Sequence, residues 1–190
     1  MSEKIIRDLL LHIGENPDRE GLQDTPKRVI KAWGEWSCGY DQNPGDILKV
    51  FQDGSEACGD EIVLVANLPV YSKCEHHMAD IFGLAHIGDI PSKGIVGLSK
   101  FQRLVNVFAR RLQVQERLTS QIADCLVEHL NPAAVGVVLE CRHMCMESRG
   151  ISTRGAITVT SALRGAFKNE DSARAEFLAL VRGASKGTSI

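Results

Sequence analysis

Two short segments, far apart in the chain, carry the side chains that most constrain the fold. Cys74-Glu75-His76-His77 and His143-Met144-Cys145 together hold three of the six histidines and two of the six cysteines. Thiolate and imidazole are the ligands that borderline-soft metal ions prefer, zinc above all. Cys74, His77 and Cys145 can supply three ligands and leave a fourth position for water, the pattern of a catalytic rather than a structural zinc. This hypothesis requires a fold that brings both segments to one ion.

Strand geometry tests this hypothesis. Residues two apart on a strand share a face, so an extended chain through His143 and Cys145 predicts that both side chains point the same way. Cys74 and His77 are three apart, so both reach one ion only if the chain turns there, at a strand end or bulge. On this interpretation His76 and His143 remain beside the metal as acid–base groups. The alternative is a set of unrelated buried residues, and spacing alone does not separate a structural ion from a catalytic one.

Composition narrows the class of protein. The 190 residues suffice for one domain with a core, and a formal net charge of −2 gives no general attraction to nucleic acid or anionic membranes, so we expect neither as a partner. No apolar run approaches the length of a membrane span, and the N-terminus lacks the apolar run of a signal peptide. Six irregularly spaced cysteines do not resemble a disulfide framework, which favours a cytoplasmic location. We expect four of them to be plain packed thiols: Cys38, Cys58, Cys125 and Cys141.

The first fifty residues are predicted to form a helical extension. Apolar residues at helical spacing predict a first helix that ends near Gly14. A second helix is expected to open at Thr25-Pro26, because threonine suits the N-cap and proline the first helical position. A stretch rich in Gly, Asp, Asn and Pro, residues 39–45, ends this pattern.

From Glu61 onward the periodicity is that of an α+β domain. Strands are predicted at residues 61–71, 82–90, 134–143 and 156–163, and helices from Ser99, from Gln113 to Asn131 and at 172–181. Gln102 stands three residues after Ser99, which predicts a capping box. The order favours a mainly antiparallel sheet. We expect an N-terminal helical extension (1–50), a catalytic domain (51–184) and a flexible tail (185–190).

Basic residues gather at two predicted helix starts. Gly97-Leu98-Ser99-Lys100 opens a helix whose N-terminal amides and dipole favour an anion, and Lys100 and Arg103 can flank that anion. Arg28 and Lys31 occupy a similar place on the Thr25-Pro26 helix. A solvated charged face is the alternative for both groups, and the residues alone favour it for Arg28 and Lys31.

A third polar group lies at the helix junction Gln113-Val114-Gln115-Glu116-Arg117. Such residues often simply cap a helix. Glu116 could, however, accept paired hydrogen bonds from the N–H groups of a guanine-like ring, with Gln115 beside it.

Taken together, these segments resemble GTP cyclohydrolase I. The similarity extends from about Gly21 to Arg182 and is carried by five segments in register: 74–77, 97–100, 113–119, 143–150 and 158–161. The resemblance implies the tunnelling fold, a four-stranded antiparallel sheet in the order ββααββ, here with an N-terminal helix pair and a C-terminal helix. It also implies a homodecamer of two pentamers with active sites between subunits.

The resemblance also implies a reaction and a set of site residues. Zn²⁺ would be held by Cys74, His77 and Cys145 and would activate water for attack on C8 of the guanine of GTP. His143 would donate a proton to N7, with His76 as a proton shuttle. Ring opening would release formate and give 7,8-dihydroneopterin triphosphate, the first step of tetrahydrofolate or other reduced pterin synthesis. The remaining contacts would be to the purine edge, from Gln115 and Glu116, and to the triphosphate, from Ser99, Lys100, Arg103, Arg149, Arg28 and Lys31.

The sequence departs from the family pattern at two places. After His77 the family usually continues with an apolar residue, proline and phenylalanine, whereas this chain has Met78-Ala79-Asp80-Ile81. Asp89 stands where the family usually has tyrosine before Ile-Pro. We expect these changes to affect pocket shape and substrate affinity, and to leave the ligand set intact.

Four alternatives remain open at this stage. One is a paralogue with an altered pterin or purine substrate. A pyruvoyl-tetrahydropterin synthase relative would be expected to use three histidine ligands, and a nitrile-reductase relative would need a nucleophilic cysteine and a nicotinamide cofactor. A non-catalytic, zinc-stabilised binding module would need a fourth protein ligand, which His76 or His143 could supply.

Overall fold

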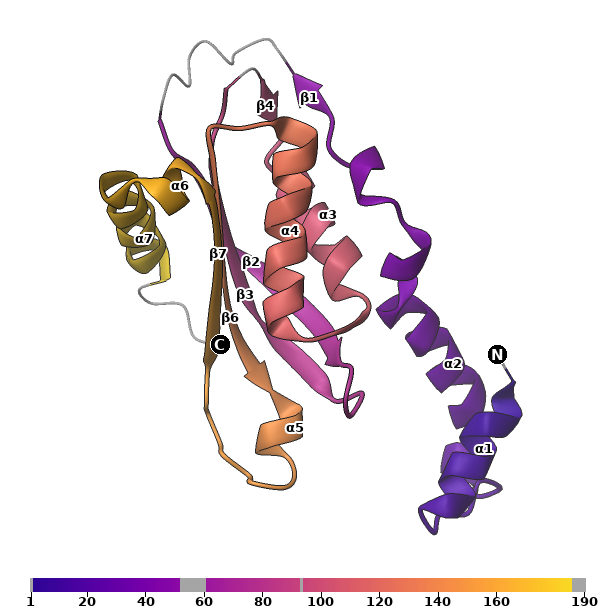
Figure 1. Cartoon of the computed structure of the whole chain (residues 1–190). Coiled ribbons are helices and arrows are strands. Elements are labelled where there is room, and N and C mark those ends of the chain that lie inside the picture. Colours follow the sequence, from indigo (N-terminus) through magenta and orange to yellow (C-terminus); the bar gives the residue numbers. More distant parts are fainter. Residues whose placement is uncertain (1, 52–60, 93, 186–190) are drawn as a thin grey trace.

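One five-stranded sheet with helices on both faces organises the chain, as Figure 1 shows for the computed structural model. The structure describes residues 2–51, 61–92 and 94–185. The strand order is β5-β2-β3-β6-β7, and the four long strands pair antiparallel. Their bounds are β2 (Val63–Cys74), β3 (Asp80–Ile90), β6 (Ala134–His143) and β7 (Thr158–Gly165). The α+β class predicted from the sequence is therefore confirmed.

The predicted count of four strands is wrong by one. Strand β5 (Leu112–Gln113) pairs in parallel with Lys73 and Cys74 at the end of β2. It lies between the two central helices, so those helices do not follow one another directly as the ββααββ order requires. Two residues are too short a run for periodicity to identify. A separate two-stranded pair joins β1 (Val50–Phe51) to β4 (Ile95–Val96).

Five of the helices described occupy predicted parts of the sequence, with differences at their ends, whereas the two short helices at Met144–Glu147 and Ala166–Asn169 were not predicted. Their bounds are α1 (Glu3–His12), α2 (Thr25–Trp36), α3 (Ser99–Ala109), α4 (Gln115–Leu130), α5 (Met144–Glu147), α6 (Ala166–Asn169) and α7 (Asp171–Ser185). Three single 3₁₀ turns lie at Glu20–Leu22, Cys38–Asp41 and Pro44–Asp46. The N-cap of α2 is Asp24 rather than Thr25. None of the helices described combines the length and apolar character needed to cross a membrane.

The predicted capping box at the start of α3 is wrong. Leu98 is the N-cap residue, and no side chain caps the helix there. Gln102 instead donates from Nε2 to the Pro69 carbonyl oxygen at 3.0 Å and to Asn106 Oδ1 at 2.9 Å. The glutamine therefore joins α3 to β2 instead of capping the helix.

Helices α3 and α4 pack on one face of the sheet and α7 on the other (Figure 1). The larger core lies under α3 and α4 and includes Phe101, Leu104, Leu118, Ile122, Val137 and Leu139. On the other face, Gly88 and Gly136 are register partners on β3 and β6. A Cβ atom at either position would lie 2.6–2.8 Å from the Phe177 ring of α7. The paired glycines therefore form the slot in which this helix docks.

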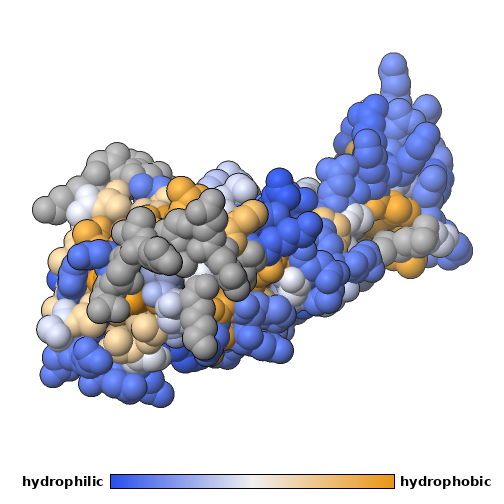
Figure 2. Space-filling view, turned by 90° about the horizontal axis from the view of Figure 1, so that it is seen from above, coloured by the Kyte–Doolittle hydropathy of each residue, from blue (hydrophilic) through white to orange (hydrophobic). Residues whose placement is uncertain are grey.

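The N-terminal helices extend away from the sheet. Figure 1 shows α1 and the start of α2 as an arm to one side of the sheet, and in Figure 2 this arm is largely hydrophilic with an apolar patch. Ile5, Leu9 and Leu11 of α1 are exposed although they are large and apolar. An amphipathic helix with such residues uncovered is typical of a segment that packs against another surface.

Candidate metal centre

The loop between β2 and β3 places Cys74 and His77 close together. Cys74 is the last residue of β2, and its N–H donates to the Ala79 carbonyl oxygen at 2.8 Å. Met78 adopts a positive φ of 54°, which turns the chain back toward β3. Cys74 Sγ and His77 Nδ1 are consequently 3.9 Å apart. The turn that the metal hypothesis required between these two residues is present.

Cys145 reaches the same place from a helical turn rather than from a strand. Strand β6 ends at His143, and α5 begins at Met144, so the predicted strand alternation through Cys145 is wrong. His143 pairs with Ile81 of β3, which sets this end of β6 beside the β2–β3 loop. Arg142 holds the turn through two hydrogen bonds to the Glu147 carboxylate, at 2.8 and 2.5 Å.

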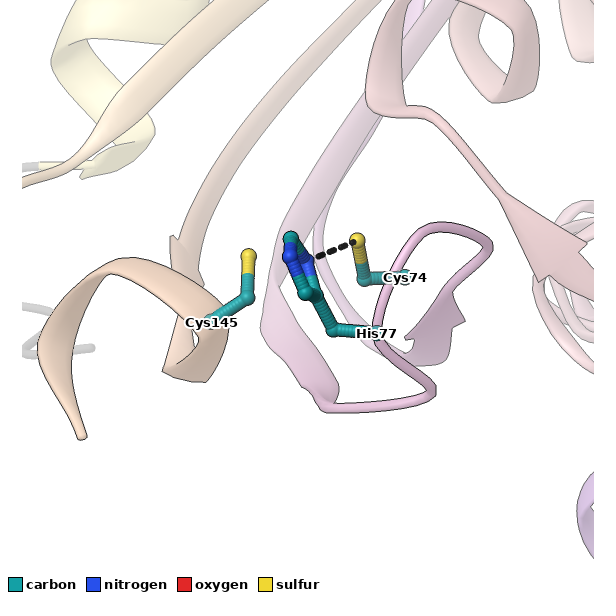
Figure 3. A group of neighbouring side chains, drawn as sticks. All are labelled: Cys74, His77 and Cys145. Carbon is teal, nitrogen blue, oxygen red and sulfur yellow. Dashed lines mark hydrogen bonds between the residues drawn. The ribbon is translucent and has the colours of Figure 1, made fainter. Parts of the chain in front are cut away.

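The three candidate ligands form one cluster (Figure 3). The donor atoms of Cys74, His77 and Cys145 all lie within 4.8 Å of one another. Donors of a tetrahedral zinc ion lie roughly 3.5–4 Å apart, so small side-chain adjustments suffice for all three to bind one ion. Two thiols and an imidazole are also the donor chemistry that zinc favours. The residues therefore fit the metal.

The surroundings of Cys145 disfavour its thiolate as long as no metal is bound. Burial raises the pKa of the Cys145 thiol, and the neighbouring Cys74 sulfur raises it further, while the charge of Arg149 lowers it. Two sulfurs this close disfavour deprotonation of both, and a bound divalent ion reverses that preference. Among the residues that the structure describes, the cluster has three members and includes neither His76 nor His143.

His143 belongs to a separate, partly buried hydrogen-bond network with Gln115. Its Nε2 lies 2.8 Å from Gln115 Oε1. The Gln115 amide nitrogen lies within hydrogen-bond distance of the Leu139 and Thr158 carbonyl oxygens, at 3.1 and 2.9 Å, and of Thr160 Oγ1 at 3.0 Å. Gln115 is 1 % exposed. Its side chain is thus fully used inside the protein.

The remaining polar candidates near the cluster are exposed. His76 Nδ1 lies 3.9 Å from Cys74 Sγ, with most of its ring in solvent. Glu116, beside Gln115, is exposed. Burial lowers the pKa of His143, and the charge of Glu116 opposes that shift. Arg149 is exposed and close enough to Cys145 to affect its pKa.

Apart from Arg149, the predicted triphosphate residues do not gather at this cluster within one chain. The C-terminus of α3 leads into β5, which pairs with Cys74, so Ser99, Lys100 and Arg103 lie toward the opposite end of an 11-residue helix. Such a helix is about 16 Å long. On α2, Arg28 pairs with Asp24 at 3.1 Å in solvent, and Lys31 is exposed.

Sequence reasoning missed Lys73 and its partners. Lys73 pairs in register with Asp80, and their Nζ–Oδ1 distance is 2.5 Å. The same Nζ lies 3.8 Å from the ring centroid of Trp36. Opposite charges seven residues apart across a predicted turn are a signal for a cross-strand pair, and that signal was present in the sequence.

The other cysteines described are free thiols. Cys125 and Cys141 are buried, and burial raises their pKa values to about 11 and about 12. Both therefore fit the prediction of packed thiols. Cys38 is half-buried and accepts from Arg110 Nη1 at 3.6 Å, which makes it more polar than expected. Cys58 lies outside the described residues.

Comparisons with known proteins identify the family. Residues 2–182 match the family model described as GTP cyclohydrolase I. A protein of Janthinobacterium sp. named GTP cyclohydrolase 1 is 61 % identical over 93 % of this chain and 88 % of its own length. Proteins of the same name from Nitrosospira multiformis and Corynebacterium glutamicum are 60 % and 54 % identical over 90 % and 94 % of this chain, and 90 % of each relative.

Proposed function

We propose that this chain, which belongs to the GTP cyclohydrolase I family and is a hydrolase acting on GTP, opens the imidazole ring of guanine at a zinc ion held by Cys74, His77 and Cys145. The products would be formate and 7,8-dihydroneopterin triphosphate, as in the first step of tetrahydrofolate or another reduced pterin synthesis. The observation that carries the zinc proposal is the convergence of two thiols and one imidazole from distant segments within 4.8 Å.

Three protein donors fit a catalytic zinc, because such sites keep one coordination position open. When bound, zinc supplies Lewis-acid activation of water near neutral pH. The loop from Cys74 to Ala79 holds two donors, and the Arg142–Glu147 pair fixes the turn that carries the third. These residues would bind the zinc ion and hold its ligands in place, and other residues would carry out the proton transfers.

His143 is the proposed proton donor to N7 of the purine, with Gln115 holding its ring. The Gln115 amide nitrogen is committed to acceptors, so its oxygen faces His143 and accepts from Nε2–H. That leaves Nδ1 of His143 to exchange a proton with the substrate. His76 is exposed and close to Cys74, which suits a proton shuttle during ring opening.

Glu116 is the proposed contact to the N–H edge of guanine. It is exposed, it follows Gln115 at the start of α4, and its charge acts on His143, so a purine bound to Glu116 would lie near the acid–base group. We propose that Gln115 acts on the reaction through His143 rather than by contacting the purine, because its polar atoms are engaged within the protein.

The triphosphate site and the assembly are proposed together. Ser99, Lys100, Arg103, Arg149, Arg28 and Lys31 would bind the phosphates from more than one subunit, because a helix length separates the first three from the cluster in one chain. Exposed apolar side chains on α1 and β7, such as Leu11 and Val159, support a homo-oligomer. We propose the decamer of two pentamers, whose ten 20.8 kDa chains would give about 208 kDa by light scattering.

Within the α+β class, we propose that the architecture is the tunnelling fold. Four long antiparallel strands with α3 and α4 on one face support it. We keep the proposed division at residues 50 and 184, since α1 and α2 extend away from the sheet (Figure 1); the proposed tail lies outside the described residues except for Ser185. Free cysteines in the described part support a reducing, cytoplasmic location.

Incubation of the zinc-loaded oligomer with GTP tests the proposal. Stoichiometric formate and, after oxidation, a fluorescent pterin are the expected products. A fully assembled, zinc-loaded sample that consumes no GTP and yields no formate would refute the proposed reaction. Turnover without formate release would instead indicate a different reaction on the same nucleotide.

A further inference from the structure

We propose that Lys73 is a positioning residue for the metal centre. Its side chain joins the base of the Cys74–Ala79 loop, here called the neck, to the aromatic side chains of α2. The inference rests on the zinc site of the proposed function. It assigns a role to a residue that touches neither metal nor substrate, and it gives the N-terminal helices a direct effect on the centre.

The neck of the loop is the register pair of Lys73 and Asp80. These are the last paired residues of β2 and β3 before the chain turns. Their side chains lie on one face of the hairpin, with Nζ 2.5 Å from Oδ1. Opposite charges directly across an antiparallel pair stabilise the pairing at that position. The loop that supplies Cys74 and His77 begins one residue further on.

The loop needs such a closure because its own conformation is strained. Met78 has a positive φ of 54°, which is unfavourable for a side chain with a Cβ atom. Such a conformation persists only where the surrounding contacts hold it. On the β5 side the loop is held by Glu75, whose N–H donates to the Gln113 carbonyl oxygen at 3.0 Å and whose carboxylate pairs with Arg117. The Lys73–Asp80 pair holds the β3 side.

Lys73 is also the link to α2. Its Nζ lies 3.8 Å from the ring centroid of Trp36 and 5.6 Å from that of Trp33. The two indoles pack edge to face at 5.6 Å. Lys73 is only 8 % exposed, so its ammonium group is held by the Asp80 carboxylate and the Trp36 ring with little contribution from water. A displacement of α2 would therefore move Lys73 and change its contact with Asp80 at the neck of the loop.

A cavity of about 290 Å³ lies beside this link, and its lining includes Glu35, Trp36, Tyr71, Lys73, Asp80 and Arg110. The space allows a methionine at position 73 to fit without overpacking. It also leaves Asp80 in contact with solvent after the ammonium is removed, because the Asp80 side chain is 60 % exposed. Lys73→Met therefore removes the link without burying an unpaired charge.

The test measures how fast the full-length, zinc-loaded oligomer releases metal to an excess of the chromophoric chelator 4-(2-pyridylazo)resorcinol. We expect Lys73→Met to release zinc about tenfold faster than the parent. Lys73→Arg, which keeps the charge and the contact with Trp36, should release zinc at nearly the parent rate. The Co²⁺-substituted Lys73→Met protein should show shifted visible absorption bands, a signature that a general loss of stability would not produce.

A second variant tests the link to α2 separately. Trp36→Leu should accelerate release when Lys73 is present and should add little in the Lys73→Met background, because both changes break the same connection. The matched control is Arg164→Met, which breaks the pair of Arg164 with Asp124, 2.8 Å apart on β7 and α4. This variant should release zinc at the parent rate.

The outcomes separate this inference from the proposed function. If the parent holds zinc and turns over GTP while folded Lys73→Met and Trp36→Leu release metal at the parent rate with unchanged Co²⁺ spectra, the positioning role is wrong and the function stands. If Arg164→Met accelerates release as much as Lys73→Met, the effect is one of stability, which also contradicts the inference. If the parent binds no stoichiometric metal, the proposed zinc site fails and the inference fails with it.

Discussion

Nε2 of His143 and Oε1 of Gln115 lie 2.8 Å apart, which joins the end of β6 to the first residue of α4. The contact is directional, because the amide nitrogen of Gln115 is taken up by the carbonyl oxygen of Thr158 and the hydroxyl of Thr160. The glutamine therefore orients an imidazole that stands two residues before the proposed ligand Cys145. Gln115 is therefore suited to support His143, the proposed acid–base group.

Replacement of Gln115 tests this support. Gln115→Met keeps the length of the side chain but removes the acceptor, so the His143 ring loses its orientation. We expect kcat to fall about 100-fold, the lower range of what a positioned acid–base group contributes. KM for GTP and zinc content should change little. A large rise in KM with nearly constant kcat would indicate instead that Gln115 contacts the purine. Gln23→Met, which changes an exposed glutamine, serves as the control and should leave kcat unchanged.

Cys145→Ala should abolish metal binding and turnover together, because two remaining protein donors do not make a zinc site. Metal content and formate release are measured on the same preparation. Cys38→Ala removes a half-buried thiol outside the cluster and should leave both unchanged. His143→Ala should keep zinc and lose ring opening, and loss of zinc in that variant would show that His143 is a ligand.

Asp89 should give the protein a pH-dependent stability. The carboxyl is 5 % exposed on β3, and burial raises its pKa from 3.8 to about 6. Because its pKa is raised in the folded state, Asp89 favours folding while its carboxyl is protonated. This contribution is complete below about pH 3.8 and is lost as the pH rises through 6. Asp89→Asn should therefore be more stable than the parent at pH 8, by up to about 3 kcal/mol, with the difference vanishing near pH 4.

Urea unfolding midpoints at pH 8, 6 and 4.5, at one protein concentration, measure this effect. Asp41→Asn changes an exposed aspartate and should leave the midpoint unchanged at all three values. A parent protein more stable than Asp89→Asn at pH 8 would mean that the carboxylate has a favourable partner in the assembly.

Phe177 should dominate the docking of α7. It is fully buried, stacks on Phe167 with ring centroids 4.8 Å apart, and fills the slot made by Gly88 and Gly136. Phe177→Ala leaves a cavity that the paired glycines cannot close, and we expect a loss of about 3–5 kcal/mol. Leu180→Ala, on the exposed side of the same helix, should cost less than about 1 kcal/mol. Equal effects in thermal unfolding would contradict this account of the slot.

The features predicted well from the sequence are those with a long periodic signal. Strand β6 was predicted at its observed bounds, because an apolar residue stands at every second position from Val135 to Cys141. The resemblance to GTP cyclohydrolase I is confirmed by the family match over residues 2–182. In both cases many residues support the same prediction, so a single residue that departs from the pattern does not change it.

The errors arose where a tertiary contact decides the local structure. Strand β5 forms because Leu112 and Gln113 pair with the end of β2. Gln102 does not cap α3, because its side chain donates to the carbonyl oxygen of Pro69. Cys145 lies on a helical turn because the Arg142–Glu147 pair ends the strand at His143. No single-chain periodicity reports such partners. The burial of Gln115 was likewise invisible, since its acceptors lie on β6 and β7.

X-ray absorption spectroscopy at the zinc edge, on protein purified without chelators and checked for stoichiometry by elemental analysis, tests the central claim most directly. We predict one zinc per chain with two sulfur donors, one imidazole nitrogen and one light donor from solvent. Absence of stoichiometric metal, or a first coordination shell of four side-chain donors, would contradict the account.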